Sequence, residues 1–385
     1  MSTKEQPSKP FTPIGAFAAG CPRMTRIKEI RFREVTRPLR TTFATSLGSK
    51  QRLHSVIVKA TLDDGAEGLG EAPTSAAFTD ETVEAIIRTL REGRIRLKGA
   101  AIEDAGEALN RLRTAGAATM ALSGLETALF RARLASSGTS EHLYWGGALS
   151  RIGTDITLPV LADQGALASW IESAARKGFS AFKAKVSGDL ARDRETVGFI
   201  YRRLRDKMDR LRLRLDGNQG YSAKTFLAFV DFLQKERIEI ELFEQPLPRH
   251  DFEGLAYIKP RCPMPLVLDE TICTVEDARR MVDQNLGDGI NVKIAKSGIS
   301  ESMKILEFAG AHGAKLMAGC MIETMVGLSA AVFLAAGAGA FDFIDLDAVC
   351  FLYGRNAYPG IKSAGPSFLI ETPGSSQPLT PSNLA

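Results

Sequence analysis

Residues 181–186 read Ala-Phe-Lys-Ala-Lys-Val, a short strand-like run in which Lys183 and Lys185 alternate with apolar side chains. Comparable apolar runs return at regular intervals from about Thr154 onward, and amphipathic helical stretches separate them. The runs are residues 156–161, 181–186, 211–215, 238–243, 266–268, 289–294, 315–318 and 343–346. Eight alternating strand and helix steps predict an α/β barrel of the (β/α)8 type. An open doubly wound sheet is the alternative, and the lack of a Gly-x-Gly-x-x-Gly fingerprint after the first strand favours the barrel.

The chain before this region has a different pattern. Apolar residues alternate in the strand manner from Arg26 to about Asp63, which predicts a small antiparallel sheet. Helical spacing follows over residues 80–91, 102–113 and 117–135. We therefore expect an α+β capping domain over residues 26–150, the barrel over residues 151–350, and a disordered tail over residues 1–25.

Three carboxylates stand at the ends of successive predicted strands. Asp216, Glu244 and Asp269 close the third, fourth and fifth runs. In a parallel barrel the carboxyl ends of the strands converge on one mouth, so these side chains are expected to meet there. Carboxylate oxygens are ligands that Mg²⁺ prefers. The sequence thus predicts a magnesium site, with Asn218 in support two residues beyond Asp216.

The lysines of the second and sixth runs are candidate bases. Residues two apart on a strand face the same way, so Lys183 and Lys185 are expected to point together into the mouth. Their mutual repulsion would lower the pKa of one of them, which then becomes a usable base. On the sixth run Lys293 faces the mouth, whereas Lys296 is expected on the other face or in the following loop.

The composition is that of an ordinary globular protein, with 44% hydrophobic and 24% charged residues among 385. The net charge of +4 is small and the basic residues form no stripe with interleaved aromatics, so we expect no nucleic-acid partner. No run is long and apolar enough to span a membrane. Five scattered cysteines predict reduced thiols and a cytoplasmic location. A weak lipoprotein-like box at residues 18–21 is the less favoured interpretation of the N-terminal tail.

At the strand-end residues the chain resembles the enolase superfamily, and specifically its muconate-lactonizing subgroup. The subgroup pattern has Lys-x-Lys on the second strand, metal-binding Asp, Glu and Asp on the next three strands, and Lys on the sixth. The matching residues here are Lys183, Lys185, Asp216, Glu244, Asp269 and Lys293. The resemblance covers nearly the whole chain after Met24 and implies a modified TIM barrel, (β/α)7β, with Mg²⁺ as cofactor. It also implies that residues 351–385 complete the cap.

One pair of residues indicates which enzymes of this subgroup the chain resembles most. Asp345-Leu-Asp347 looks like the Asp-x-Asp motif of the dipeptide epimerases, in which two carboxylates hold the α-ammonium of the substrate. A carboxylate pair away from the metal also makes a pocket for a cation. The cap loop expected at the substrate side chain runs from Thr42 through Phe43 to Gly48, and Gly48 stands where some relatives have an Arg that contacts glutamate. We therefore expect a small or apolar C-terminal residue at least as readily as glutamate.

The reaction that this resemblance implies is epimerisation of an L-Ala-Xaa dipeptide by two-lysine 1,1-proton transfer. Lys185 would remove the α-proton, Lys293 would return one to the other face, and Lys183 would keep Lys185 a base. A bound Mg²⁺ would stabilise the enediolate. Analogy with the superfamily also suggests a homo-oligomer.

Other reactions remain open at the same site. N-succinylamino-acid racemase, o-succinylbenzoate synthase and muconate-type cycloisomerase chemistry would use the same lysines and metal, but their substrates offer no free α-ammonium to Asp345 and Asp347. A metal-stabilised binding protein without catalysis is a further alternative, and the two-lysine arrangement argues against it.

Overall fold

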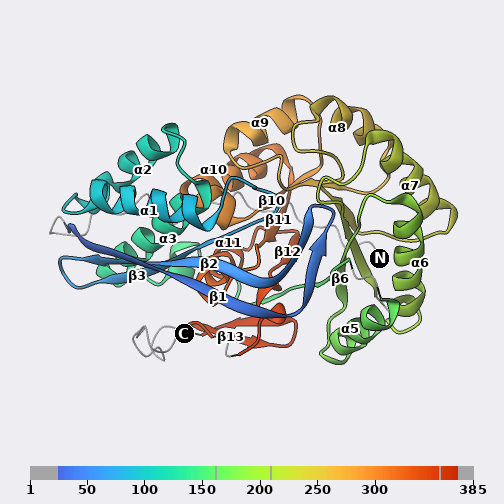
Figure 1. Ribbon diagram of the computed structural model, residues 1–385, viewed down its shortest axis with the longest axis horizontal. Helices are drawn as coiled ribbons and strands as arrows, with labels where there is room; N and C mark the ends of the chain where they lie inside the picture. Colours follow the sequence, from blue (N-terminus) through green and yellow to red (C-terminus); the bar gives the residue numbers. More distant parts are fainter. Residues whose placement is uncertain (1–24, 161–162, 209, 355–356, 372–385) are drawn as a thin grey trace.

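The computed structural model describes residues 25–160, 163–208, 210–354 and 357–371. Two bodies lie side by side in Figure 1, the cap in blue and cyan and the barrel from green to orange. Of the tail expected at residues 1–25, all but Thr25 lies outside the described residues. Within the described ranges no helix combines the length and the apolar character that a membrane span needs.

The barrel sheet follows the chain order, and each strand pairs in parallel with the next. Its strands are β5 (Ile156–Leu158), β6 (Ala181–Lys185), β7 (Arg212–Asp216), β8 (Leu242–Glu244), β9 (Leu266–Leu268), β10 (Gly289–Val292), β11 (Lys315–Gly319) and β12 (Phe343–Asp345). Every predicted strand is present, so the mixed α/β barrel fold is confirmed. The largest difference is in the fourth strand, which begins at Leu242 and not at residue 238.

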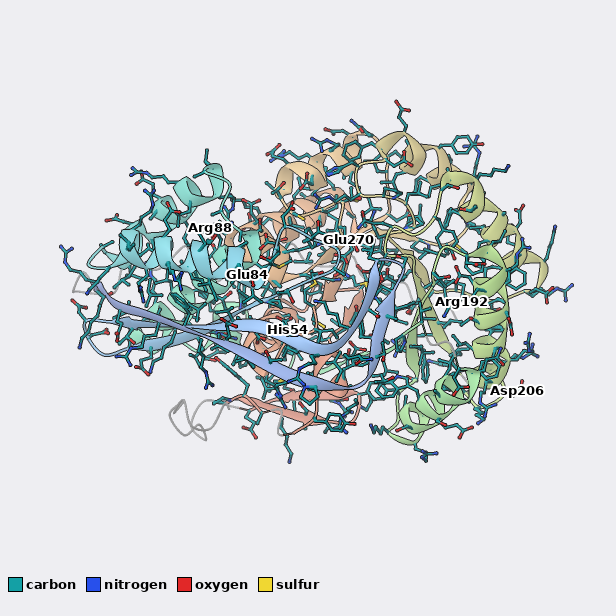
Figure 2. All side chains as sticks on the ribbon, viewed as in Figure 1. His54, Glu84, Arg88, Arg192, Asp206 and Glu270 are labelled. Atoms are coloured by element: carbon teal, nitrogen blue, oxygen red, sulfur yellow. The ribbon has the colours of Figure 1, made fainter. Side chains whose placement is uncertain are left out.

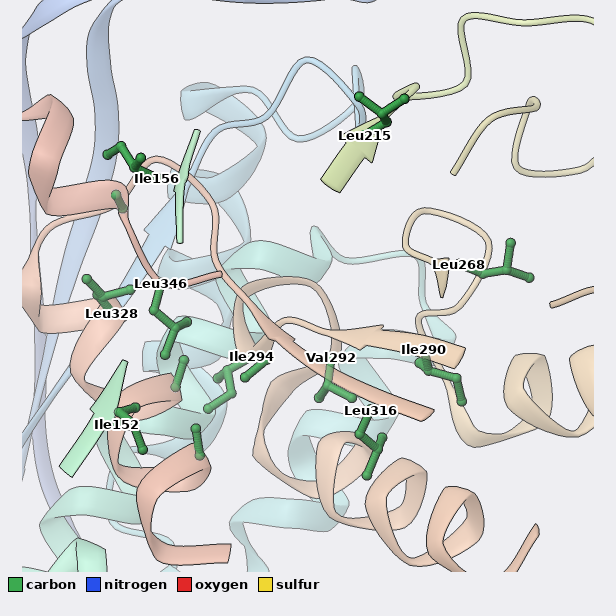
Figure 3. Packing of buried hydrophobic residues seen from close by; sticks show 14 of the residues in the cluster. Ile152, Ile156, Leu215, Leu268, Ile290, Val292, Ile294, Leu316, Leu328 and Leu346 are labelled. Atoms are coloured by element: carbon green, nitrogen blue, oxygen red, sulfur yellow. The ribbon is translucent and has the colours of Figure 1, made fainter. Parts of the chain in front are cut away.

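Helices cover the outside of the barrel (Figure 1). They are α5 (Gln164–Arg176), α6 (Leu190–Arg205), α7 (Ala223–Lys235), α8 (Phe252–Ile258), α9 (Val275–Asp283), α10 (Ile294–His312) and α11 (Met325–Ala338). Residues such as Leu215, Leu268 and Ile290 belong to the hydrophobic cluster of this layer (Figure 3). Because side chains alternate along a strand, the residues beside them, Asp216 and Asp269, point the other way, toward the barrel axis.

The cap is built on a long antiparallel hairpin. Strand β1 (Ile27–Thr45) pairs with β2 (Gly48–Leu62), and β3 (Glu67–Pro73) adds to the other edge of β2. Helices α1 (Val83–Leu97), α2 (Ala105–Thr114) and α3 (Thr119–Ser136) enclose a second hydrophobic cluster with this sheet. The predicted sheet and three helices are therefore confirmed, and the tip of the β1–β2 hairpin reaches the barrel (Figure 1).

The C-terminal segment forms a small sheet of its own. Strand β14 (Ser367–Ile370) is the middle strand and pairs antiparallel with β13 (Ile361–Ala364) on one side and with β4 (Arg151–Gly153) on the other. Buried side chains of this hairpin join the hydrophobic cluster of the barrel. The contacts of the C-terminal segment with β1 of the cap include a bridge between Leu39 and Leu352 and a hydrogen bond from Arg40 Nε to Leu352 O at 2.9 Å. This pairing with β4 was not foreseen, and the domain boundaries themselves stay a prediction.

A buried carboxylate joins the cap to the barrel. Glu71 of β3 is 3% exposed and accepts hydrogen bonds from Thr324 Oγ1 (2.6 Å) and Gly327 N (2.9 Å) at the start of α11. It also accepts one from Ser55 Oγ (2.7 Å) within the cap sheet. A carboxylate at a helix N-terminus is favoured by the unpaired N–H groups and the helix dipole. The junction thus fixes the cap over the barrel mouth.

Candidate active site

The three predicted carboxylates end adjacent strands. Asp216 and Glu244 are the last residues of β7 and β8, and Asp269 directly follows β9. Each is at most 2% exposed. The alternation of the strands places them inside the mouth, because the outward positions beside them carry the apolar residues that meet the helices.

Lys183 lies among carboxylates from three strands. Its Nζ is 2.5 Å from Asp345 Oδ2, 2.7 Å from Glu244 Oε2 and 3.1 Å from Asp216 Oδ2. Burial alone would lower the pKa of Lys183, but these three carboxylates outweigh burial and raise it well above its usual range. The expected lowering by the lysine pair is therefore not found at Lys183. Lys185 Nζ lies 2.5 Å from the same Asp216 Oδ2.

On the opposite side of the mouth two further lysines meet Asp269. Lys293 follows β10 directly, and its Nζ is 2.5 Å from Asp269 Oδ2. Lys296 was expected on the other face or in a loop, and this prediction is wrong. Helix α10 begins at Ile294, so Lys296 lies in its first turn, is 1% exposed, and its Nζ is 2.7 Å from Asp269 Oδ1.

The Asp-x-Asp pair lies at the end of β12, as expected, and a third carboxylate joins it. Oxygens of Asp345, Asp347 and Asp155 all lie within 4.8 Å of one another. Arg214 balances this group, with its Nη1 2.8 Å from Asp155 Oδ2. Burial and the charge of Asp345 raise the pKa of Asp347 to about 6. Asp155 was not predicted because it lies before the first barrel strand, and the prediction considered only residues at the C-terminal ends of strands.

The cap closes the cavity above these charges. Phe43, Leu47 and Gly48 of the hairpin line it together with residues 74–77 of the cap and 320–322 of the barrel. Figure 2 labels Glu270, another lining residue, where the hairpin tip meets the barrel. The ring of Phe43 lies 5.7 Å from Lys185 Nζ. Gly48 has φ +135°, a conformation that L side chains rarely adopt, which explains glycine at this position.

Lys50 also lines the cavity and is hydrogen-bonded to the neutral backbone of the cap. Its Nζ donates to Thr74 O at 2.6 Å and so ties the hairpin to the loop after β3. Burial lowers the pKa of Lys50 to about 8. The cap side of the cavity thus combines apolar residues (Phe43, Leu47, Ala76, Ala77) with polar ones (Thr45, Lys50, Thr74, Ser75).

The donor set of the mouth fits a hard cation. Asp216, Glu244 and Asp269 supply carboxylate oxygens, and two neighbouring buried oxygens, Asn218 Oδ1 and Glu270 Oε2, have no hydrogen-bond partner among the described residues. A set made only of oxygens, some of them unpaired, is what Mg²⁺ prefers. The second carboxylate group brings Asp155, Asp345 and Asp347 together and has Lys183 and Arg214 as cationic partners.

Comparison with known proteins identifies the family of the chain. The mandelate racemase/muconate lactonizing enzyme N-terminal domain matches residues 27–140, and the enolase C-terminal domain-like family matches residues 166–354. The chain is 33% identical over 330 residues to the hydrophobic dipeptide epimerase of Citrifermentans bemidjiense, covering 83% of this chain and 88% of the relative.

Solved structures give the same result. A substrate-liganded complex of the L-Ala-D/L-Glu epimerase from Bacillus subtilis superposes with a TM-score of 0.84 at 29% identity, covering 90% of this chain and 96% of that one. The dipeptide epimerase of Enterococcus faecalis with Mg and L-Leu-L-Tyr has a TM-score of 0.82 at 27% identity, covering 90% and 97%. The chain therefore belongs to the mandelate racemase/muconate lactonizing family of the enolase superfamily and, within it, to the isomerases of the dipeptide epimerase group.

Proposed function

We propose that this protein is a Mg²⁺-dependent epimerase that inverts the α-carbon of the C-terminal residue of L-Ala-Xaa dipeptides. One observation carries the proposal. Lys185 on β6 and Lys293 after β10 flank the three strands that bear Asp216, Glu244 and Asp269. A substrate carboxylate held over the middle strand would have one lysine on each side of its α-carbon, which is the arrangement that a 1,1-proton transfer needs.

Each residue of the site has a separate role in the proposed reaction. Asp216, Glu244 and Asp269 would hold Mg²⁺, which neutralises the negative charge that develops on the substrate carboxylate. Lys185 removes the α-proton from one face, and Lys293 delivers a proton to the other. Lys183 keeps its charge among Asp345, Glu244 and Asp216 and holds these carboxylates in place.

Asp345 and Asp347 bind the N-terminal ammonium and so select which α-carbon lies between the lysines. Asp347 Oδ2 accepts a hydrogen bond from Thr157 N at 2.5 Å, which fixes its carboxylate at the cavity wall. This pair distinguishes a free dipeptide from the N-succinylated substrates of the alternative reactions, because an acylated nitrogen carries no charge.

A cluster of apolar residues in the cavity wall supports a hydrophobic C-terminal side chain. Leu47 and Phe43 line the cap side of the cavity, with Met321 and Ile322 from the barrel. The relative from Citrifermentans bemidjiense bears the name hydrophobic dipeptide epimerase, which supports the same preference.

Proton NMR in D2O tests the proposal. The protein with Mg²⁺ is incubated with L-Ala-L-Leu, L-Ala-L-Phe, L-Ala-L-Glu and N-succinyl-L-phenylalanine, each with and without EDTA. We expect loss of the C-terminal α-proton signal and growth of the D-epimer signals, fastest for leucine or phenylalanine and abolished by EDTA. Turnover of the N-succinyl compound alone would overturn the dipeptide assignment and favour the racemase alternative.

A further inference from the structure

Helix α10, which begins directly after Lys293, is broken near its start. Gly298 has φ +78° and ψ 177°, so the first turn, residues 294–297, is separated from the helix that restarts at Ile299. A helical hydrogen-bond ladder cannot run through such a residue. The turn that carries Lys296 and follows Lys293 therefore needs other contacts to fix its position.

The cap helix α3 supplies these contacts on both sides of the break. Before the break, Ser123 Oγ donates a hydrogen bond to Ile294 O. After it, the Glu126 carboxylate accepts from Ile299 N (3.0 Å) and Ser300 N (3.1 Å) and also from the Ser300 hydroxyl. Glu126 thus acts as an N-terminal cap for the restarted helix from a different domain.

Packing at the break is equally close. A Cβ atom at Gly298 would lie 2.2 Å from Glu126 Oε2, so only glycine allows this approach. Ala295 in the first turn is buried and belongs to the hydrophobic cluster of the cap, not to that of the barrel. The first turn of α10 is therefore docked on α3 by polar and apolar contacts together.

We propose that Glu126 is a positioning residue for Lys293: by fixing the restart of α10 at Ile299 and Ser300 on helix α3, it anchors the C-terminal end of the short turn that follows Lys293. The inference rests on the proposed two-lysine reaction. Lys185 lies at the end of β6, a strand that is held in place by its pairing with β5 and β7. Its position therefore does not depend on α10. Loss of the Glu126 contacts should therefore displace one base and leave the other in place.

Separate exchange measurements on the two epimers test this asymmetry. The variants are Glu126→Ala and the conservative Glu126→Gln, which keeps the side-chain shape and one acceptor oxygen. Glu81→Ala is a matched control, because Glu81 caps the start of the same helix α3 by accepting from Thr119 N and Met120 N, and both of these donors belong to α3. Proton NMR in D2O records the initial rate of α-proton loss from L-Ala-L-Leu and from L-Ala-D-Leu.

In Glu126→Ala we expect exchange from the epimer that uses Lys293 to fall at least about tenfold, since a displacement of about 1 Å costs up to 10²-fold in rate. Exchange from the other epimer should stay within about twofold, and epimerisation should fall with the slower step. Glu126→Gln should lie between, and Glu81→Ala should change both exchange rates by the same factor.

Equal loss of both exchange rates in Glu126→Ala, or no loss in either, would overturn the positioning role. If the wild-type protein exchanges neither epimer, the proposed function fails and this inference fails with it. If the wild-type protein exchanges both epimers and the Glu126 variants lose exchange from one epimer only, both the proposed function and the positioning role are supported. Failure of the function and failure of the positioning role therefore give different results.

Discussion

Removal of the Glu71 carboxylate should weaken the junction between cap and barrel. In Glu71→Ala the backbone N–H groups of Thr324 and Gly327 lose a buried acceptor, and the hydroxyls of Ser55 and Thr324 lose theirs. Two orphaned N–H groups at roughly 1–3 kcal/mol each, with hydroxyls that can turn elsewhere, give a loss of about 4 kcal/mol in the free energy of unfolding. For a chain of 385 residues this corresponds to a fall in Tm of roughly 5 °C.

Differential scanning calorimetry of the full chain measures this effect. Glu71→Gln keeps one acceptor oxygen without the charge and should lose about half as much. Glu67→Ala is the control on the same strand, because the Glu67 side chain is 41% exposed and its pair with Lys59 should contribute less than about 1 kcal/mol. A Tm of Glu71→Ala equal to that of Glu67→Ala would refute the reasoning that the carboxylate holds the junction.

Three further changes should have separable effects. Asp347→Asn should lower kcat/KM for L-Ala-L-Leu by roughly ten- to hundredfold, because the substrate ammonium loses a charged partner; steady-state kinetics with unchanged kcat/KM would contradict the ammonium pocket. Gly70→Ala should destabilise by about 1–3 kcal/mol in thermal melts, since its Cβ would lie 1.9 Å from Gly124 O of α3. Leu47→Arg should raise the rate for L-Ala-L-Glu relative to L-Ala-L-Leu in a competition assay, and an unchanged ratio would remove Leu47 from the specificity wall.

The barrel and the strand-end residues could be predicted from the sequence because two simple geometric rules apply together. Strands alternate in and out, and parallel strands all end at one mouth, so Asp216, Glu244 and Lys293 were placed without knowledge of any contact. Each assignment needed only its own short run of sequence. The position of Asp347 followed in the same way from the last run.

What could not be predicted depends on contacts between distant residues or on where one element ends. Lys296 was misplaced because α10 begins with no intervening loop, which turns its side chain back to Asp269. The raised pKa of Lys183 follows from Asp345, which is 162 positions away in the chain. Glu126 carries no local signal, because an acidic residue within a helix is common on a solvated face.

The charges of the mouth link the metal requirement to the lysine bases. Four lysines and five carboxylates, each at most 6% exposed, meet there: Lys183, Lys185, Lys293, Lys296, Asp216, Glu244, Asp269, Asp345 and Asp347. Buried charges are tolerated only when they are paired, and each of these lysines has a carboxylate within 2.7 Å. Burial lowers the pKa of Lys293, but Asp269 and Glu244 outweigh burial and raise it, so the carboxylates around Lys293 oppose loss of its proton. Loss of that proton would leave Asp269 buried with one cationic partner fewer, which is costly unless another cation takes its place.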